Sequence, residues 1–314
     1  MRNIMERQEF LKEEKKSEFK NWMLVFLFLI MAPTSLFAQS FDGLNHLENY
    51  KTQTYYSNGA IEPATTMTER CDKVLAYYKN ILNFEPSVSL LVLSPKDWSK
   101  YTNFPFYGMP HYNDSKTLIV ASEDNEFWRS FAKQINMAPE ALAQQMNVTY
   151  SDKNGNLSMK PFFDLLAIHE LGHAYHNQGG LKMQRKWMGE LFPNILLHTY
   201  IAENEPELLP ALTLFPKMVV SSTDKTTLKY TSLLDLENNY TELGQKFPVN
   251  YGWYQCRWHM AAGTIYDNGG LEAIKNLWTA LKTEQELLDD ASFIKMLSED
   301  AHQSIANVPL KWDE

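Results

Sequence analysis

The sequence predicts an α+β fold in which a small mixed sheet near the N-terminus is followed by a mostly helical region. The chain has 314 residues, 44% of them hydrophobic, which is enough to bury a substantial core. Two short apolar runs typical of strands come early, at 87–94 and 116–123. From residue 160 onward nearly every segment has helical periodicity. Strands and helices are therefore segregated along the chain, as in α+β proteins.

Residues 1–38 are predicted to be a signal peptide, or a leader plus signal, rather than part of the fold. The apolar run MLVFLFLIMAPTSLFAQS (23–40) follows several lysines and ends in small or polar residues. This pattern predicts cleavage near Ala38 and export to the periplasm or the cell exterior. The run is too short for a regular membrane span, so we expect no stable span in the mature chain. Two alternatives stay open: an uncleaved anchor, and a start codon assigned too early.

Net charge and cysteine content narrow the classes of partner and fold. The formal net charge is −9 at pH 7, and no basic stripe with interleaved aromatic residues stands out. Both observations argue against a nucleic-acid partner. Cys71 and Cys256 are the two cysteines, on predicted helices far apart in the sequence. They could pair in an exported protein, but Cys is also a common buried small hydrophobic residue, so either state is possible.

Residues 39–159 are predicted to form an N-terminal helix and β-sheet part. It opens with an irregular lead-in, followed by a helix, the two strands and two short helices. Turn residues in NFPFYGMPHYND separate the strands. The lead-in is 39–60, the long helix is 64–82, and the short helices are in NEFWRSFAKQI and PEALAQQMN.

Residues 160–314 are predicted to form a helical part that carries the chemistry. The first two helices hold the motifs described below, and the third stretch is less regular than the others. The predicted segments are 160–177, 183–203, 206–243, 250–267, 270–282 and 284–305.

The segment FFDLLAIHELGHAYHNQGG (162–180) places His169 and His173 four residues apart. On a helix both imidazoles project from one face, one turn apart, and can bind one zinc ion. Glu170 is rotated by about 100° from His169. It would lie beside the metal, where it can take a proton from zinc-bound water and pass it to a leaving amine. Gly172 would allow close approach of another element. The alternative is a chance match on a His-rich helix.

A third ligand is needed, because a catalytic zinc ion usually has three protein ligands and a water molecule. Glu190 lies on the apolar face of the next predicted helix, where an unpaired carboxylate would be costly unless it bound a metal. Asn194, one turn later, could hydrogen-bond a ligand histidine. His176 is poorly placed to complete the site from the same straight helix, and Pro193 should kink the second helix. The alternative ligands are Glu203, Glu205 and Glu207.

HELGH followed by WMGE (187–190) resembles the gluzincin metallopeptidases, the thermolysin-like and aminopeptidase-like group. Members of this group carry HExxH on one helix and a glutamate zinc ligand on the next. The resemblance is specific over about 160–203 and looser elsewhere. It implies one Zn²⁺ ion, with Glu170 as general base and with the ligands His169, His173 and Glu190.

Some features depart from related patterns. Asn194 stands where thermolysin-like members place a carboxylate. The metzincins need Gly and then His where this chain has His176 and Gly179, so they do not match. The thimet-type oligopeptidases share HExGHxxH and rank second, because they are much longer and place their glutamate farther downstream.

A donor for the oxyanion is expected on the helix NYGWYQCRWHMAAGTIYDNGG (250–270), since Tyr or His usually stabilises that charge. The candidates are Tyr251, Tyr254 and His259. Aminopeptidase-like gluzincins draw a catalytic Tyr from this region, so we expect Tyr254 or Tyr251 to take this role. The alternative is that these aromatic residues only pack a helical core.

Taken together, the sequence predicts an exported zinc metallopeptidase whose catalytic domain comprises 39–159 and 160–314. Its partner would be a peptide or protein substrate, which could pair as an extended strand with a sheet edge near Tyr107 and Gly108. Two alternatives remain: a non-catalytic zinc-containing peptide-binding module, and a metal-dependent amidohydrolase acting on a non-peptide substrate. Glu170 favours catalysis, because a purely structural zinc site would not need it.

Overall fold

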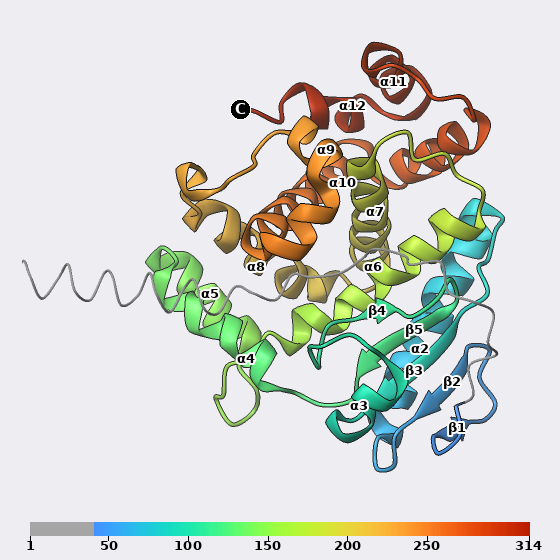
Figure 1. Ribbon diagram of the computed structural model, residues 1–314, viewed down its shortest axis with the longest axis vertical. Coiled ribbons are helices and arrows are strands. Elements are labelled where there is room, and N and C mark those ends of the chain that lie inside the picture. The colour runs from blue at the N-terminus through green and yellow to red at the C-terminus, as the bar shows by residue number, and fades with distance from the viewer. Residues whose placement is uncertain (1–40) are drawn as a thin grey trace, which may run out of the picture.

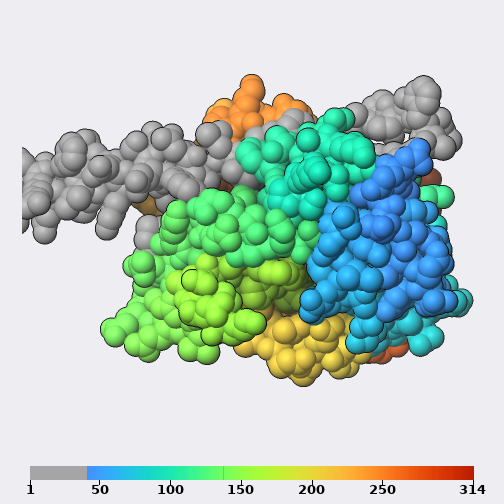
Figure 2. All heavy atoms as spheres, turned by 90° about the horizontal axis from the view of Figure 1, so that it is seen from below, coloured from blue at the N-terminus to red at the C-terminus, as the bar shows by residue number. Residues whose placement is uncertain are grey.

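The computed structural model describes residues 41–314 and shows an α+β fold, as predicted (Figure 1). The N-terminal part forms a five-stranded mixed sheet, and the chain from residue 160 onward is helical. In Figure 2, residues of the N-terminal part, coloured blue to green, make up most of the face turned to the viewer. The predicted signal peptide (1–38), with its cleavage near Ala38, lies outside the described residues. Within 41–314, no helix is long and apolar enough to cross a membrane.

The sheet has the strand order β1-β2-β3-β5-β4. The three inner strands are parallel, and the two outer strands run antiparallel to their neighbours. In β3 and β5 almost every residue is buried, so both read as continuous apolar runs, which is typical of parallel strands covered on both faces. The strands are β1 (Asn45–Leu47), β2 (Gln53–Tyr56), β3 (Ser89–Leu93), β4 (His111–Tyr112) and β5 (Thr117–Ala121).

The helices of the N-terminal part join the strands and connect the sheet to the helical part. The longest of them, α2, links β2 to β3, and the hydroxyl of its Tyr78 donates to the Leu196 carbonyl of the helical part at 2.6 Å. A 3₁₀ turn, Lys133–Met137, follows α4. The helices are α2 (Ile61–Leu82), α3 (Pro95–Tyr101), α4 (Glu126–Ala132) and α5 (Glu140–Tyr150).

The helical part is built around a long helix, α10, which packs against α7 and α8. Two 3₁₀ turns, Pro206–Leu208 and Lys225–Thr227, flank α8, and a π-helical turn, Leu297–Ala301, joins the last two helices. The helices are α6 (Lys160–Gln178), α7 (Lys186–Asn204), α8 (Leu209–Ser222), α9 (Leu233–Lys246), α10 (Pro248–Thr283), α11 (Asp290–Met296) and α12 (Gln303–Leu310).

Several predicted segments differ from the structure, including 206–243, which holds the two separate helices α8 and α9. The prediction of an irregular lead-in over 39–60 is wrong, because this segment holds the strands β1 and β2. The helices predicted at 250–267 and 270–282 form one helix, α10, broken at Gly270, where φ is 53° and ψ is −149°. The helix predicted over 284–305 is also wrong: α10 ends at Thr283, and two short helices follow, capped by the side chains of Asp289 and His302.

The close approach of α6 and α7 depends on Gly172, as its position in the sequence predicted. A Cβ atom at Gly172 would lie 2.6 Å from the Cα atom of Pro193 on α7, which is closer than real Cβ atoms come to other atoms. The missing side chain thus lets the two helix backbones touch. This contact brings Glu190, about one turn before Pro193, and Asn194, directly after it, close to the histidines of α6.

Candidate metal centre and substrate pocket

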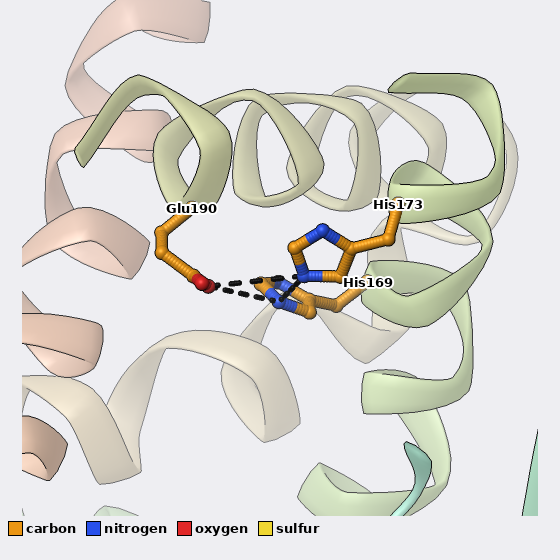
Figure 3. Close-up of side chains that lie close together, drawn as sticks. All are labelled: His169, His173 and Glu190. Atoms are coloured by element: carbon orange, nitrogen blue, oxygen red, sulfur yellow. Dashed lines mark hydrogen bonds and ion pairs between the residues drawn. The ribbon is translucent and has the colours of Figure 1, made fainter. Parts of the chain in front are cut away.

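The predicted ligands His169, His173 and Glu190 lie together in the structure (Figure 3). The two histidines project from α6 one turn apart, and Glu190 reaches them from α7. His173 Nε2 is 3.2 Å from His169 Nε2. Glu190 Oε2 is 3.7 Å from His169 Nε2 and 3.8 Å from His173 Nε2. All three side chains are buried.

This geometry fits a metal ion. A tetrahedral zinc ion with bonds of about 2.0–2.1 Å separates its ligand atoms by about 3.4 Å, and the three measured separations bracket that value. Two imidazoles and one carboxylate are also a donor set found in catalytic zinc sites. Burying three such polar groups together is costly unless they are compensated, as a cation would do. The group could therefore bind a metal ion.

The charge states of the ligands also suit a cation. Burial lowers the pKa of His173 to about 3, so this imidazole is neutral at pH 7. For Glu190, burial opposes ionisation, but the neighbouring histidines and Tyr240 outweigh it and hold the pKa well below its usual range. For His169, burial favours the neutral form, but the contact with Glu190 outweighs it and raises the pKa. Metal binding at these atoms would compete with protons.

Asn194 makes the contact that its position predicted. Its Oδ1 atom lies 3.2 Å from His169 Nδ1, and its Nδ2 donates to the Glu190 carbonyl at 3.0 Å. The second bond fixes the amide, so that Oδ1 faces the imidazole. An acceptor at Nδ1 places the proton there and leaves Nε2 free to bind a metal.

Glu170 lies beside the ligand group rather than within it. It is buried and lines the same pocket as His169. Burial raises the pKa of its carboxyl to about 8, although His169 acts in the opposite direction. Among the described residues, its Oε2 atom has no hydrogen-bond partner. A buried carboxylate oxygen without a partner is costly and indicates a role that a water molecule or a ligand completes.

A pocket opens beside the candidate metal centre. Its polar wall comes from α6 and α10. Its apolar wall comes from α6, α8 and the segment before β4. The polar residues at the centre are His169, Glu170, Tyr251, Gln255 and His259, and the apolar wall includes Phe104, Met109, Phe162, Leu166 and Phe215.

The structure separates the two tyrosines proposed as oxyanion donors. Tyr251 lines the pocket. Tyr254 does not: its hydroxyl donates to the Ser232 carbonyl at 2.7 Å, and its ring stacks on Trp312. Helical phase explains the difference. At about 100° per residue, Tyr251 and His259 bound an arc of about 80° that faces the pocket. Tyr254 lies about 60° outside this arc, on the Tyr251 side, and faces the core. Tyr254 therefore packs in the helical core, as the alternative interpretation held, and does not lie at the pocket as an oxyanion donor would.

The other candidates do not join the ligand group. His176 is half-buried, and burial lowers its pKa to about 4. Glu203 instead accepts a hydrogen bond from the Tyr266 hydroxyl at 2.6 Å. Glu205 pairs with Arg70 at 3.1 Å. Cys71 and Cys256 are both buried free thiols.

Two residues at the site were not singled out from the sequence. The Tyr240 hydroxyl donates to Glu190 Oε1, and Gln255 Nε2 donates to Glu190 Oε2 at 2.8 Å. Gln255 could have been found, because it follows Tyr251 by one helical turn. Nothing in the sequence indicates that Tyr240 lies at the site, because it belongs to a stretch whose helical pattern is weak.

The chain was also compared with known proteins. No protein-family model matches it, and no curated protein matches it significantly. Any function must therefore be inferred from the residues of the site and their geometry.

Proposed function

We propose that the protein is an exported, gluzincin-type zinc metallopeptidase that hydrolyses peptide bonds. The observation that carries this proposal is a buried His169–His173–Glu190 group with Glu170 beside it, whose carboxyl oxygen Oε2 has no hydrogen-bond partner among the described residues. Structural zinc sites are usually closed by a fourth protein ligand. Among the described residues, no further His, Cys, Asp or Glu joins this group. A three-ligand site next to a pocket supports catalysis instead.

The residues of the site divide the work of hydrolysis. A bound zinc ion supplies Lewis acidity, which polarises a carbonyl and makes water more acidic. Glu170 accepts a proton from the water that attacks the peptide carbonyl carbon. It then passes this proton to the amide nitrogen as the C–N bond breaks, which gives a carboxylate and an amine. Tyr251 and His259 line the same pocket and can donate hydrogen bonds to the oxyanion.

The edge strand β4 supports binding of an extended peptide. The Asn113 amide donates to the Thr117 carbonyl at 3.3 Å, so these residues form a hydrogen-bonded pair of the antiparallel ladder. Such pairs alternate with pairs whose backbone groups face outward. The N–H and C=O of Tyr112 therefore point away from β5, toward the free edge. Met109 and His111 line the pocket, so this edge borders the site. The apolar wall favours substrates with an apolar side chain near the cleaved bond.

The test uses protein purified without residues 1–38, incubated with a complex peptide mixture that is then analysed by mass spectrometry. The variant Glu170→Gln keeps the size of the side chain but removes the base. The matched control is Glu207→Gln, which changes an exposed carboxylate after α7. We expect new peptide termini with the parent and the control, and at least about 100-fold fewer with Glu170→Gln. A chelator should abolish them in all three proteins.

The opposite result has a defined meaning. If parent and Glu170→Gln both bind one zinc ion and neither gives new peptide termini, the peptidase assignment is wrong. The protein would then be a non-catalytic zinc-containing peptide-binding module, or an amidohydrolase for a non-peptide substrate.

A further inference from the structure

Both oxygens of the Glu190 carboxylate have a hydrogen-bond donor from outside α6 and α7. Tyr240 of α9 donates to Oε1, and Gln255 of α10 donates to Oε2 at 2.8 Å. Oε2 is also the atom nearest to both histidines, at 3.7 and 3.8 Å. Tyr240 holds Oε1, while Oε2 faces the two histidines. This arrangement leaves one lone pair of one oxygen for the ligand position.

Tyr240 reaches the site because α9 is broken immediately before it. Asn239 has non-helical dihedral angles inside α9, with φ −121° and ψ 20°, and its side chain donates to the Asp235 carbonyl at 2.9 Å. The first half of α9 is also fixed to the start of α7, where the Trp187 amide donates to the Glu237 carboxylate at 3.1 Å. The break and this anchor together place the Tyr240 hydroxyl at Glu190, which is three positions after Trp187.

Gln255 connects Glu190 to the pocket. Its Nε2 atom lies 2.8 Å from Glu190 Oε2 and 2.8 Å from the Tyr251 hydroxyl. An amide nitrogen carries two hydrogens, so it can serve both acceptors at once. The Tyr251 oxygen then accepts a hydrogen bond. The Tyr251 hydroxyl also lies 3.4 Å from the Tyr240 hydroxyl. Because the Tyr240 proton is used on Glu190, Tyr251 is the donor in this longer contact, and a substrate oxygen in the pocket that Tyr251 lines would compete for its proton.

We infer that Tyr240 and Gln255 are positioning residues of the metal centre. They hold Glu190 as a ligand through a single oxygen, and Gln255 also donates to the Tyr251 hydroxyl. This inference rests on the metal-binding part of the proposed function and not on peptide hydrolysis. Partners of metal ligands typically change metal affinity by about 10-fold to 100-fold when they are removed.

The experiment measures zinc affinity by competition with a chromophoric chelator and records the visible spectrum of the Co²⁺-loaded protein. The variants are Tyr240→Phe, which removes only the hydroxyl, and Gln255→Met, which keeps the side-chain length. Tyr78→Phe is the matched control, because it removes a buried hydroxyl that is bonded to the α7 backbone far from the pocket. We expect zinc affinity to fall by about 10-fold to 100-fold in both variants and by less than about 2-fold in the control. The cobalt spectrum should shift only in the two variants.

Zinc affinities within about 2-fold of the parent and an unchanged cobalt spectrum in either folded variant would overturn the inference for that residue. Circular dichroism of the metal-free proteins separates this result from misfolding. If Tyr240→Phe does not fold, Tyr240→Trp, which keeps an aromatic N–H donor, provides the second test. Peptide cleavage is not used as a readout. Weaker zinc binding in the variants of a protein that cleaves no peptide would keep this inference and reject only the peptidase function.

Discussion

At the scale of single residues, the buried histidine His111 shows how an imidazole outside the ligand group is satisfied. Its Nδ1 atom lies 2.9 Å from the Met109 carbonyl, and its Nε2 atom lies 2.7 Å from the Thr102 hydroxyl. The carbonyl can only accept, so Nδ1 carries the proton and Nε2 accepts from Thr102. Burial lowers the pKa of His111 to about 4, because the imidazolium would lose its hydration.

His111 should make stability depend on pH. Between about pH 4 and the ordinary histidine pKa of about 6.5, the unfolded chain binds a proton that the folded protein does not. The free energy of unfolding therefore rises with pH across this window and levels off above it, by about 3 kcal/mol from this residue. In urea unfolding at several pH values, His111→Gln should show a flatter profile than the parent between pH 4 and 6.5. An equal slope in both proteins would contradict this assignment.

Asn194 should affect metal affinity through His169. Asn194→Ala removes the acceptor at His169 Nδ1, so we expect zinc affinity to fall by about 10-fold to 100-fold in chelator competition. Asn204→Ala is a close control. The Asn204 side chain makes the same bond to a carbonyl four residues earlier, also at 3.0 Å, but has no histidine partner. Equal losses in both variants would mean that Asn194 acts only through the stability of α7.

Residue spacing in the sequence predicts the ligand group but not all of its surroundings. The four-residue spacing of His169 and His173 places both on one helix face without further information. The choice of Glu190 followed from an acidic residue on an otherwise apolar face, and the structure brings it to the histidines. Tyr240 could not be predicted in this way, because its position depends on a helix break that no proline or glycine marks.

At the scale of elements, the contact of α6 with α7 positions the metal ligands. Gly172→Ala should push the helices apart, because its Cβ atom would lie 2.6 Å from Pro193 Cα and 2.7 Å from its Cβ. Overpacking of this kind costs about 1–3 kcal/mol. Glu190 should also move away from the histidines, so zinc affinity should fall together with the urea midpoint.

The control for Gly172→Ala is Gly244→Ala on α9, where a Cβ atom would meet no other atom within 4 Å. Alanine is better than glycine inside a helix by about 1 kcal/mol. The Gly244 variant should therefore be as stable as the parent or more stable, with the same zinc affinity. If Gly172→Ala behaves in the same way, the close approach of the two helices is not needed for the site.

The elements that the sequence predicted best are those with strong periodicity or continuous apolar runs. Helices α2, α6 and α7 and strands β3 and β5 begin and end within about three residues of their predicted bounds. Strands β1 and β2 were missed because they are short and largely polar. The segment after Thr283 was predicted to be one helix. It holds two short helices, α11 and α12, which begin after the side-chain caps Asp289 and His302. Such caps depend on local geometry that periodicity does not reveal.

At the scale of the whole molecule, metal binding should stabilise the fold. The ligands come from two helices that pack against each other, so unfolding would separate them and release the ion. Free zinc at about 100 times its dissociation constant should add about 2.7 kcal/mol. For a chain of this size we expect the melting temperature to rise by about 5–10 °C in scanning calorimetry. The double variant His169→Gln/His173→Gln should show no rise; an equal rise would place the bound zinc elsewhere.

The three candidate metal ligands and Glu170 all lie between residues 169 and 190, whereas most of the pocket wall comes from the first half of α6, from α8 and α10, and from the segment before β4. In evolutionary terms, the candidate ligands and the proposed base are encoded in one short stretch of the gene, and most of the pocket wall is encoded in others. Substitutions and loop insertions in the walls can alter which molecules enter without touching the ligands. On the proposed function, descendants of this protein would acquire new substrates through changes in the walls while residues 169–190 stay unchanged.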